Sequence, residues 1–343
     1  MRLNINKYNN INELKNTIMK KILLAVTAAL AITGCSQNEE FESTGLKSEI
    51  VFNTIVSKTT RAAVTDITGL RSSGFTVYAY NTGANIISSE GLELTNSIIP
   101  EGLAVTSSGE NWIFTGTYYW PLNDYVQFFA YATDDAVTEY SVSAGLPTLK
   151  YTIASDVKSQ KDFVVAQAND KKKMAEALQL TFTHALTQVN FSVIGADNST
   201  YKISSVSIEG VAESGVYSFK TGKWTAGSET TGKYAYTIAS NASVSSSTTA
   251  VQLDQQNGIL MLMPQAMTDA AQIKISYSVY NGETEISKSE NTVIPLKETA
   301  AWEAGKKVRY TLKLANNAAT MTFAPEVGPW ANDDDTPVNK DVE

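Results

Sequence analysis

The chain of 343 residues contains one histidine, His184, and one cysteine, Cys35, so it is poor in the side chains that usually carry chemistry. A mononuclear zinc site takes three or four ligands from histidine, cysteine and carboxylate side chains, and a disulfide needs two cysteines. We therefore expect neither a zinc site nor a disulfide, and we expect no metal and no cofactor. A histidine base could only be His184, and no Gly-x-Ser-x-Gly segment accompanies it. Because a single histidine at a strand end usually has a structural role, we expect no enzyme.

Two other groups of residues could bind a ligand. The acidic runs 134–135 and 333–335 offer oxygen ligands for calcium, but neither has the spacing of a calcium loop, which favours solvated turns. Aromatic residues gather in the segment 112–121, where Tyr118 and Trp120 face outward if the alternate residues face the core. Such a face could stack on a sugar, although aromatic residues along strands more often fill a core.

The cysteine follows a segment that is typical of an export signal. Residues 19–35 read MKKILLAVTAALAITGC, with two lysines, an apolar run and small residues before Cys35. We expect residues 1–34 to be a signal peptide whose true start is Met19. The segment 31–35 resembles a bacterial lipobox, in which Cys35 is acylated and becomes the first mature residue. Lipid on Cys35 anchors such a protein in a membrane leaflet, and residues 35–47 then form an acidic tether.

The rest of the chain is predicted to be all-β. Apolar residues recur at every second position, or in short β-branched and aromatic runs bounded by Gly, Asn, Asp and Ser. Five such runs are residues 75–80, 126–131, 178–182, 188–193 and 273–277. The segment 170–178 is the best helical candidate, or else a polar connection. With 43% hydrophobic residues, 18% charged residues and a net charge of -8, the composition argues against disorder and against nucleic-acid binding.

The number of strands indicates more than one domain. One β-sandwich takes about one hundred residues, so this chain fits two sandwiches in tandem. The charged segment 169–173 lies between two strand-like runs and is the expected joint. The expected domains are residues 48–170 and residues 171–343, the second ending in an acidic tail.

Several motifs follow one another in a characteristic order along nearly the whole chain. They are the lipobox at Cys35, the strand that precedes Thr-Arg-Ala at Arg61, and the runs 119–131, 178–186, 262–265 and 302–312. This order resembles the fimbrillin family of Bacteroidales, the lipoprotein-derived subunits of type V pili, and in particular its Mfa-like branch. The resemblance implies two transthyretin-like β-sandwich domains, no catalysis, and export to the outer membrane as a lipoprotein.

The resemblance also implies a maturation cut. In that family an arginine-specific protease cuts after a basic residue in the loop that follows the first strand. The matching bond here is Arg61-Ala62, and cutting it releases residues 35–61 together with the lipid anchor.

The released segment contains a strand that alternates in character. Ile50, Phe52 and Thr54 are expected to face one side, and Val51, Asn53 and Ile55 the other. Losing the strand leaves an open groove with unpaired backbone groups. A strand from another subunit can fill this groove, which is donor-strand exchange.

We therefore expect a structural fimbrial subunit, compatible with adhesion, that passes from the cell outer membrane to an extracellular fimbrium. Its expected partners are other fimbrillin subunits, an arginine-specific protease and the outer membrane. The alternative is a surface lipoprotein that does not polymerise and binds carbohydrate or a host glycoprotein. The acidic tail 331–343 makes a poor donor strand, so residues 319–330 are the better candidate unless they complete the subunit's own second domain. A stalk, tip or accessory subunit fits the sequence equally.

Overall fold

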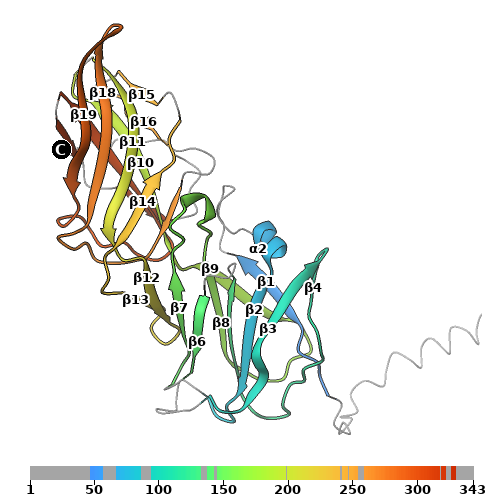
Figure 1. Ribbon diagram of the computed structural model, residues 1–343. Helices are drawn as coiled ribbons and strands as arrows, with labels where there is room; N and C mark the ends of the chain where they lie inside the picture. The colour runs from blue at the N-terminus through green and yellow to red at the C-terminus, as the bar shows by residue number, and fades with distance from the viewer. Residues whose placement is uncertain are drawn as a thin grey trace, which may run out of the picture. The chain divides into compact units, whose positions relative to one another are not determined.

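A computed structural model gives the fold of this chain. The residues it describes are 47–56, 67–85, 94–132, 137–142, 145–197, 199–239, 242–245, 247–253, 259–316, 318–321 and 326–329. Residues from Ser48 onward belong to one compact unit. This unit is built almost entirely of β-strands (Figure 1). The prediction of an all-β protein is therefore confirmed.

The first sheet has seven strands in the order β1-β9-β8-β5-β2-β3-β4 (Figure 1). Their bounds are β1 Phe52–Val56, β2 Phe75–Asn81, β3 Ser97–Ser108, β4 Asn111–Ile113, β5 Val126–Ala132, β8 Val164–Lys171 and β9 Leu178–His184. Neighbouring strands are antiparallel except for β1 and β9, which run parallel. The two edge strands β1 and β4 also contact each other, so the sheet curves around its own apolar core.

One short helix packs against this sheet. Helix α2, Ile67–Ser73, contacts β1 and β3 and buries Leu70 in the apolar core. It ends at Gly74, whose N–H donates to the Leu70 carbonyl at 2.8 Å and whose φ is 74°. A Cβ at Gly74 would lie 2.5 Å from the Val105 carbonyl oxygen, so glycine is required there. The sequence did not predict this helix, because seven residues with an internal glycine show no clear amphipathic repeat.

Two further sheets face each other across a second core. The first has the order β16-β10-β20-β21 with β17 and β22 attached, and the second has the order β14-β11-β18-β19 with β15 attached. Their bounds are β10 Thr187–Gly195, β11 Thr200–Val211, β14 Gly232–Tyr236, β15 Ser243–Val244, β16 Val251–Gln252, β17 Leu260–Leu262, β18 Gln272–Asn281, β19 Thr284–Pro295, β20 Lys306–Ala315, β21 Ala318–Met321 and β22 Glu326–Pro329. The rings of Phe191 in β10 and Tyr236 in β14 meet at 4.9 Å, which places both sheets on one core.

A four-stranded sheet joins residues from both halves of the chain. Its order is β13-β12-β7-β6, and a short 3-10 helix, η1 Val157–Ser159, follows β7. The strand bounds are β6 Val137–Ser141, β7 Thr148–Thr152, β12 Ser214–Ser218 and β13 Lys223–Ala226. Because β7 pairs with β12, strands that are far apart in the sequence lie side by side.

The strand-like runs of the sequence all lie in strands, namely β2, β5, β9, β10 and β18. Residues 172–177 connect β8 to β9 without a helix, so the segment 170–178 is a strand end followed by a polar connection. The expected boundary after residue 170 falls inside β8, and β9 still belongs to the seven-stranded sheet. The last strand of the seven-stranded sheet, β9, ends at His184, and the next strand, β10, begins at Thr187 in another sheet. The division into two transthyretin-like domains stays a prediction.

Candidate functional site

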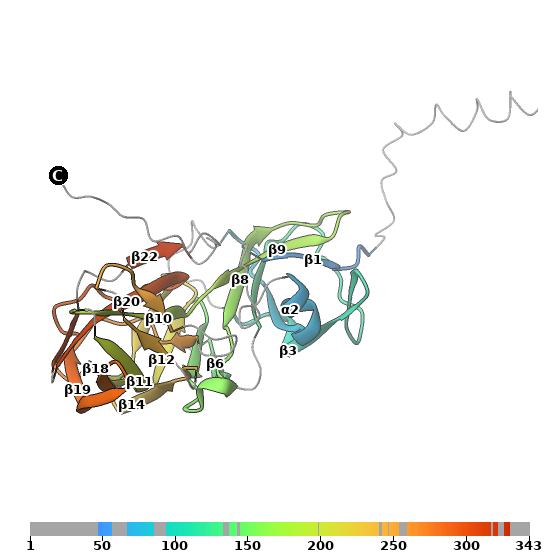
Figure 2. The ribbon, with the colours of Figure 1, turned by 90° about the horizontal axis from the view of Figure 1, so that it is seen from above.

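The first strand, β1, lies at the edge of the seven-stranded sheet, beside β9 (Figure 2). In its parallel register Phe52 lies opposite Leu178, and the Leu178 N–H donates to the Val51 carbonyl at 2.7 Å. Just before β1 the Ile50 N–H donates to the Tyr118 carbonyl at 2.8 Å. Among the described strands β1 therefore has a full ladder on one side only.

Alternate side chains of β1 point into the core. Ile50, Phe52 and Val56 are buried, and the ring of Phe52 contacts three aromatic rings of the same core. The ring centroids lie 6.1 Å from Phe75, 5.6 Å from Phe114 and 6.2 Å from Phe128, each in an edge-on arrangement. The alternation expected from the sequence is present. We call the pockets that Ile50, Phe52, Thr54 and Val56 fill the β1 groove.

Thr54 is the polar member of the buried set. Its side chain lies in the groove with the residue only 7% exposed, and its Oγ1 has no hydrogen-bond partner in the described part of the chain. The backbone N–H and carbonyl of every second residue point to the same side of a strand, and the Val51 carbonyl points toward β9. The backbone groups of Thr54, three residues later, therefore point away from β9. The Thr54 N–H donates to Oδ1 of the neighbouring Asn53 at 2.9 Å.

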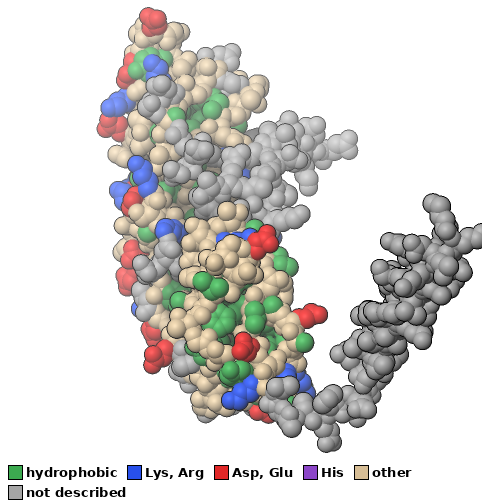
Figure 3. All heavy atoms as spheres, turned by 90° about the vertical axis from the view of Figure 1, so that its right-hand side faces the viewer, with side chains coloured by type: hydrophobic (Ala, Val, Ile, Leu, Met, Phe, Trp, Pro, Cys, Tyr) green, Lys and Arg blue, Asp and Glu red, His purple; other side chains and the backbone are tan. Residues whose placement is uncertain are grey.

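The outer face of β1 carries apolar side chains. Val51 is 46% exposed and Ile55 is 53% exposed, and Ile113 of β4 is also exposed. Figure 3 shows hydrophobic side chains among polar ones on the face that includes β1 and β4. Exposed apolar residues on an edge strand favour association with another chain.

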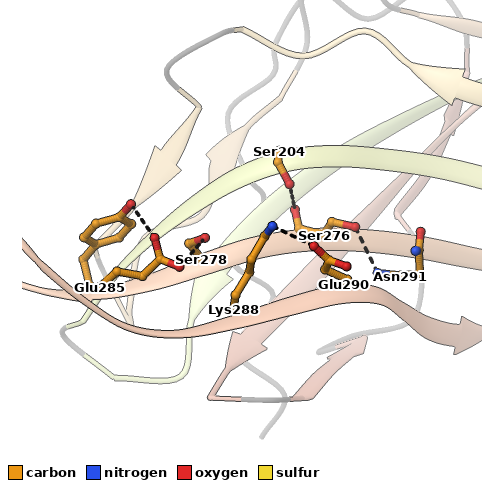
Figure 4. Close-up of polar contacts among 8 residues, drawn as sticks. Ser204, Ser276, Ser278, Glu285, Lys288, Glu290 and Asn291 are labelled. Atoms are coloured by element: carbon orange, nitrogen blue, oxygen red, sulfur yellow. Dashed lines mark hydrogen bonds and ion pairs between the residues drawn. The ribbon is translucent and has the colours of Figure 1, made fainter.

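Another edge strand, β19, differs from β1. Its outer positions carry charges, including Lys288 and Glu290, which form an ion pair at 2.6 Å (Figure 4). The strand bulges at Asn291, whose φ is 50° and whose N–H donates to the Ser276 hydroxyl at 2.9 Å. Charges and bulges prevent edge-to-edge pairing. Charged side chains and a bulge therefore protect β19 against pairing with another chain, and β1 has neither of these features.

Some predicted sites lie outside the described residues. These are the lipidation site Cys35, the cleavage site Arg61 and Ala62, and the acidic runs 134–135 and 333–335. In the sequence Arg61 falls between the end of β1 at Val56 and the start of α2 at Ile67. The described residues contain no group of three or more His, Cys, Asp or Glu side chains that could hold a metal ion. No helix in the described ranges is long and apolar enough to cross a membrane.

The expected outward orientation of Trp120 is wrong. Trp120 is only 5% exposed, and its ring packs against Phe128 at 5.5 Å in the core. Tyr118 is half-buried against Phe114 at 6.1 Å. The cause is the backbone pairing of this segment with the chain before β1, because the Trp120 N–H donates to the Ser48 carbonyl at 2.9 Å. This pairing turns Trp120 inward, and the structure does not bring the two side chains together as an exposed aromatic face.

His184 is a buried residue at the end of β9. Its Nδ1 lies 2.6 Å from Oδ2 of Asp162, which precedes β8 and is also buried. The next residue, Ala185, donates its N–H to the Phe163 carbonyl at 2.8 Å and accepts a hydrogen bond from the Trp224 indole at 2.5 Å. The pair thus holds the chain where it leaves the seven-stranded sheet, which is the structural role expected for His184.

Sequence reasoning identified β1 but missed its partner. The run 178–182 was expected in the second domain, whereas β9 forms the wall of the β1 groove. The unsatisfied hydroxyl of Thr54 was also missed, because its burial depends on distant strands. The hydrogen bond from the Thr54 N–H to the Asn53 side chain was missed as well. The only local signal was a polar residue at an inward position of an otherwise apolar alternation.

The comparisons with known proteins agree with this architecture. The fimbrillin-like family matches residues 60–330. Fimbrium subunit Fim1C of Phocaeicola vulgatus is 26% identical over 379 aligned positions, which cover 93% of this chain and 98% of that protein. The crystal structure of a fimbrial protein from Bacteroides vulgatus shares the fold, with a TM-score of 0.65 and 20% identity, and the match covers 82% of this chain and 99% of that chain. Because the family match spans well over half of the sequence, the chain belongs to the fimbrillin-like family, in its Mfa-like branch.

Proposed function

We propose that this protein is a structural subunit of an extracellular fimbrium, exported as a lipoprotein through Cys35 and assembled by strand exchange at the β1 groove. Membership of the fimbrillin-like family supports the fimbrial role, as does the similarity to a fimbrium subunit over nearly the whole chain. The proposal includes a cut at the Arg61-Ala62 bond by an arginine-specific protease.

The observation that carries the proposal is that an edge strand fills the core. Among the described strands β1 pairs with β9 alone, yet Phe52 and Val56 of β1, and Ile50 just before it, lie among buried residues. Burying each such side chain stabilises the fold by roughly 1.5 to 3 kcal/mol. An edge strand can leave without breaking the order of the other strands, but the groove then exposes this apolar surface. A replacement strand restores both the burial and the ladder with β9.

The cut changes how strongly β1 is held. In the intact chain β1 is tethered to α2 by residues 57–66, so its local concentration near the groove is in the millimolar range or above. After a cut at Arg61 the segment 35–61 is a separate peptide and can dissociate. Lipid on Cys35 leaves with it. One cut therefore frees the subunit from the membrane and makes the groove available.

The proposal is tested with Arg61→Ala and a matched control, Arg71→Ala, in protein that begins at Cys35. Arg71 lies in the last turn of α2, outside the expected cut. Each protein is digested with an arginine-specific protease and followed by intact mass and size-exclusion chromatography. We expect Arg71→Ala to be cut after Arg61 and to form oligomers, whereas Arg61→Ala stays uncut and monomeric. Oligomers of Arg61→Ala would contradict the proposal.

The glycan-binding alternative has lost its main support. It depended on an exposed pair formed by Tyr118 and Trp120, and Trp120 lies in the core. No other observation on the described residues favours it over assembly.

A further inference from the structure

Three tyrosine rings stack where two sheets of the described structure meet. Tyr78 is in β2 of the seven-stranded sheet, and Tyr140 is in β6 of the four-stranded sheet. Their ring centroids are 3.6 Å apart, and the ring planes differ by only 3°. The third ring, Tyr131 of β5, stacks on Tyr78 more loosely, at 6.4 Å and 27°. The closest contact therefore joins strands of two different sheets.

The stack of Tyr78 on Tyr140 is closer than aromatic packing alone favours. Neighbouring rings in proteins usually have centroids about 4.5 to 7 Å apart, and they prefer an offset or edge-on arrangement to a face-to-face one. Another described tyrosine pair, Tyr201 and Tyr277, follows this rule with centroids 6.0 Å apart and ring planes at 58°. The fold instead holds Tyr78 and Tyr140 with their ring faces in contact.

Neighbouring residues fix both phenols of this stack. Gly102 in β3 has a φ of 76°, and a Cβ there would lie 2.6 Å from the Tyr78 hydroxyl oxygen. Glycine therefore leaves the space that the hydroxyl end of the Tyr78 ring occupies. On the other ring, the Tyr140 hydroxyl accepts a hydrogen bond from the Tyr80 hydroxyl at 3.1 Å. Tyr78 and Tyr140 are each half-buried, so a small oxidant in solvent can reach them.

Phenols that are stacked face to face can be joined by oxidation. A one-electron oxidant removes an electron from each phenol, and the two phenolic protons pass to solvent. The unpaired electron of each tyrosyl radical is shared with the ring carbons next to the hydroxyl-bearing carbon, and radicals couple through their ring faces. A carbon–carbon bond then forms between the rings, and the hydrogen on each bonded carbon moves to the phenol oxygen. The product is dityrosine, which has two hydrogen atoms fewer than two tyrosines.

We propose that Tyr78 and Tyr140 form a modification site, at which a diffusible one-electron oxidant joins β2 to β6 through a dityrosine bond. The bond ties the four-stranded sheet to the seven-stranded sheet. Because it closes a loop of about 60 residues, it restricts the unfolded chain as a disulfide does. The sequence offers no disulfide for this purpose, since Cys35 is its only cysteine. The inference goes beyond the proposed function and depends on neither the cut nor strand exchange.

The test uses uncut protein that begins at residue 35, with Cys35→Ser so that no thiol competes for the oxidant. The oxidant is tris(bipyridine)ruthenium(III), which is generated by light with persulfate as the terminal electron acceptor. The monomer is isolated by size-exclusion chromatography and measured by intact mass and dityrosine fluorescence. We expect the monomer to lose two hydrogen atoms and to gain this fluorescence. Tyr78→Phe and Tyr140→Phe should each abolish the product, because phenylalanine keeps the ring but has no phenol to oxidise.

The matched control is Tyr131→Phe, which removes the phenol of the more distant neighbour of Tyr78 and should leave the product unchanged. Oxidation should also raise the urea midpoint of unfolding of the protein with both tyrosines, and not that of Tyr78→Phe.

Three results would overturn the inference. The first is that the monomer forms no dityrosine under conditions that dimerise N-acetyltyrosine. The second is a product that persists in Tyr78→Phe or Tyr140→Phe, and the third is a product that is lost in Tyr131→Phe. None of these results bears on the cut after Arg61, so the proposed function stands or falls separately.

Discussion

The side-chain Oδ1 of Asn53 accepts a hydrogen bond from the backbone N–H of Thr54 at 2.9 Å. This N–H lies on the side of β1 that faces away from β9, where it could otherwise pair with a strand of another molecule. Asn53 therefore closes part of the open edge of β1 with its own side chain. Thr54 meanwhile carries a buried hydroxyl with no partner in the described structure. Together the two residues make β1 a strand that is protected while attached and imperfectly fitted to its groove.

Thr54→Val is expected to stabilise the uncut protein. Valine has nearly the same shape and removes a buried hydroxyl that is costly to leave unsatisfied. The free energy of unfolding should rise by about 1 kcal/mol or more, measured by urea denaturation. The control is Thr181→Val on β9, an exposed threonine opposite Ile55, which should change it by less than about 0.5 kcal/mol. Equal changes in the free energy of unfolding for the two substitutions would mean that the buried Thr54 hydroxyl does not destabilise the protein.

Phe52→Ala is expected to destabilise the attachment of β1 strongly. The substitution removes a ring that contacts three other rings in the core, and such a truncation typically costs about 3 to 5 kcal/mol. Hydrogen exchange of β1 amides in the uncut Phe52→Ala protein should become faster than in the uncut wild type, whereas exchange of β5 amides should change much less. Ile55→Ala, on the exposed face of the same strand, is the control and should leave exchange nearly unchanged. Unchanged exchange in Phe52→Ala would contradict the assigned role of the pocket.

His184→Ala is expected to be among the more damaging substitutions. It removes the ring that lies 2.6 Å from the buried carboxylate of Asp162, and breaking a buried pair costs about 3 to 5 kcal/mol. The measurement is the free energy of unfolding, with the exposed neighbour Thr183→Ala as the control. A loss below about 1 kcal/mol would show that the pair does not hold the end of β9.

The stability of the second core should depend on pH through Glu209. Its oxygens lie 2.9 Å from Lys233 Nζ and 2.7 Å from Lys274 Nζ. Burial raises the pKa of Glu209, but the hydrogen bonds from Lys274 and Lys233 outweigh it and lower the pKa below its ordinary value of 4.5. The unfolded chain therefore binds the proton at higher pH than the folded chain does. The stabilisation is complete above pH 4.5 and is lost as the pH falls through the lowered pKa.

Glu209→Gln provides the measurement for this dependence. Melting temperatures between pH 7 and pH 3 should show the wild type to be more stable than Glu209→Gln at pH 7, with the difference shrinking below pH 4.5. The control is Glu290→Gln, which removes an exposed pair with Lys288 that solvent and salt weaken. A difference that stays constant down to pH 3 would refute the assignment to Glu209.

The strands could be predicted from the sequence because their pattern is local. The alternation in residues 75–80 and 178–182 reflects one buried face, and both segments are strands. Residues 50–56 show the same alternation, and the burial of Ile50 and Phe52 agrees with it. The expected role as a fimbrial subunit, in contrast, came from the order of motifs along the chain, which resembles that of a known family.

Features that depend on distant contacts could not be predicted in this way. The parallel pairing of β1 with β9 joins segments far apart in the sequence, and no local signal specifies such a partner. Trp120 faces the core because its backbone bonds to Ser48, which reverses the side expected from its neighbours alone. The weakness at Thr54 likewise exists only because β9 and the surrounding sheet bury its hydroxyl.

The most direct test of the central claim is to digest protein that begins at Cys35 with an arginine-specific protease and follow its mass and size. The account predicts one early cut at Arg61-Ala62, release of residues 35–61 that contain β1, and growth of oligomers from the shortened chain. A cut chain that keeps β1 bound, or loses it and remains a stable monomer, would contradict the claim that β1 is a strand held in place for exchange.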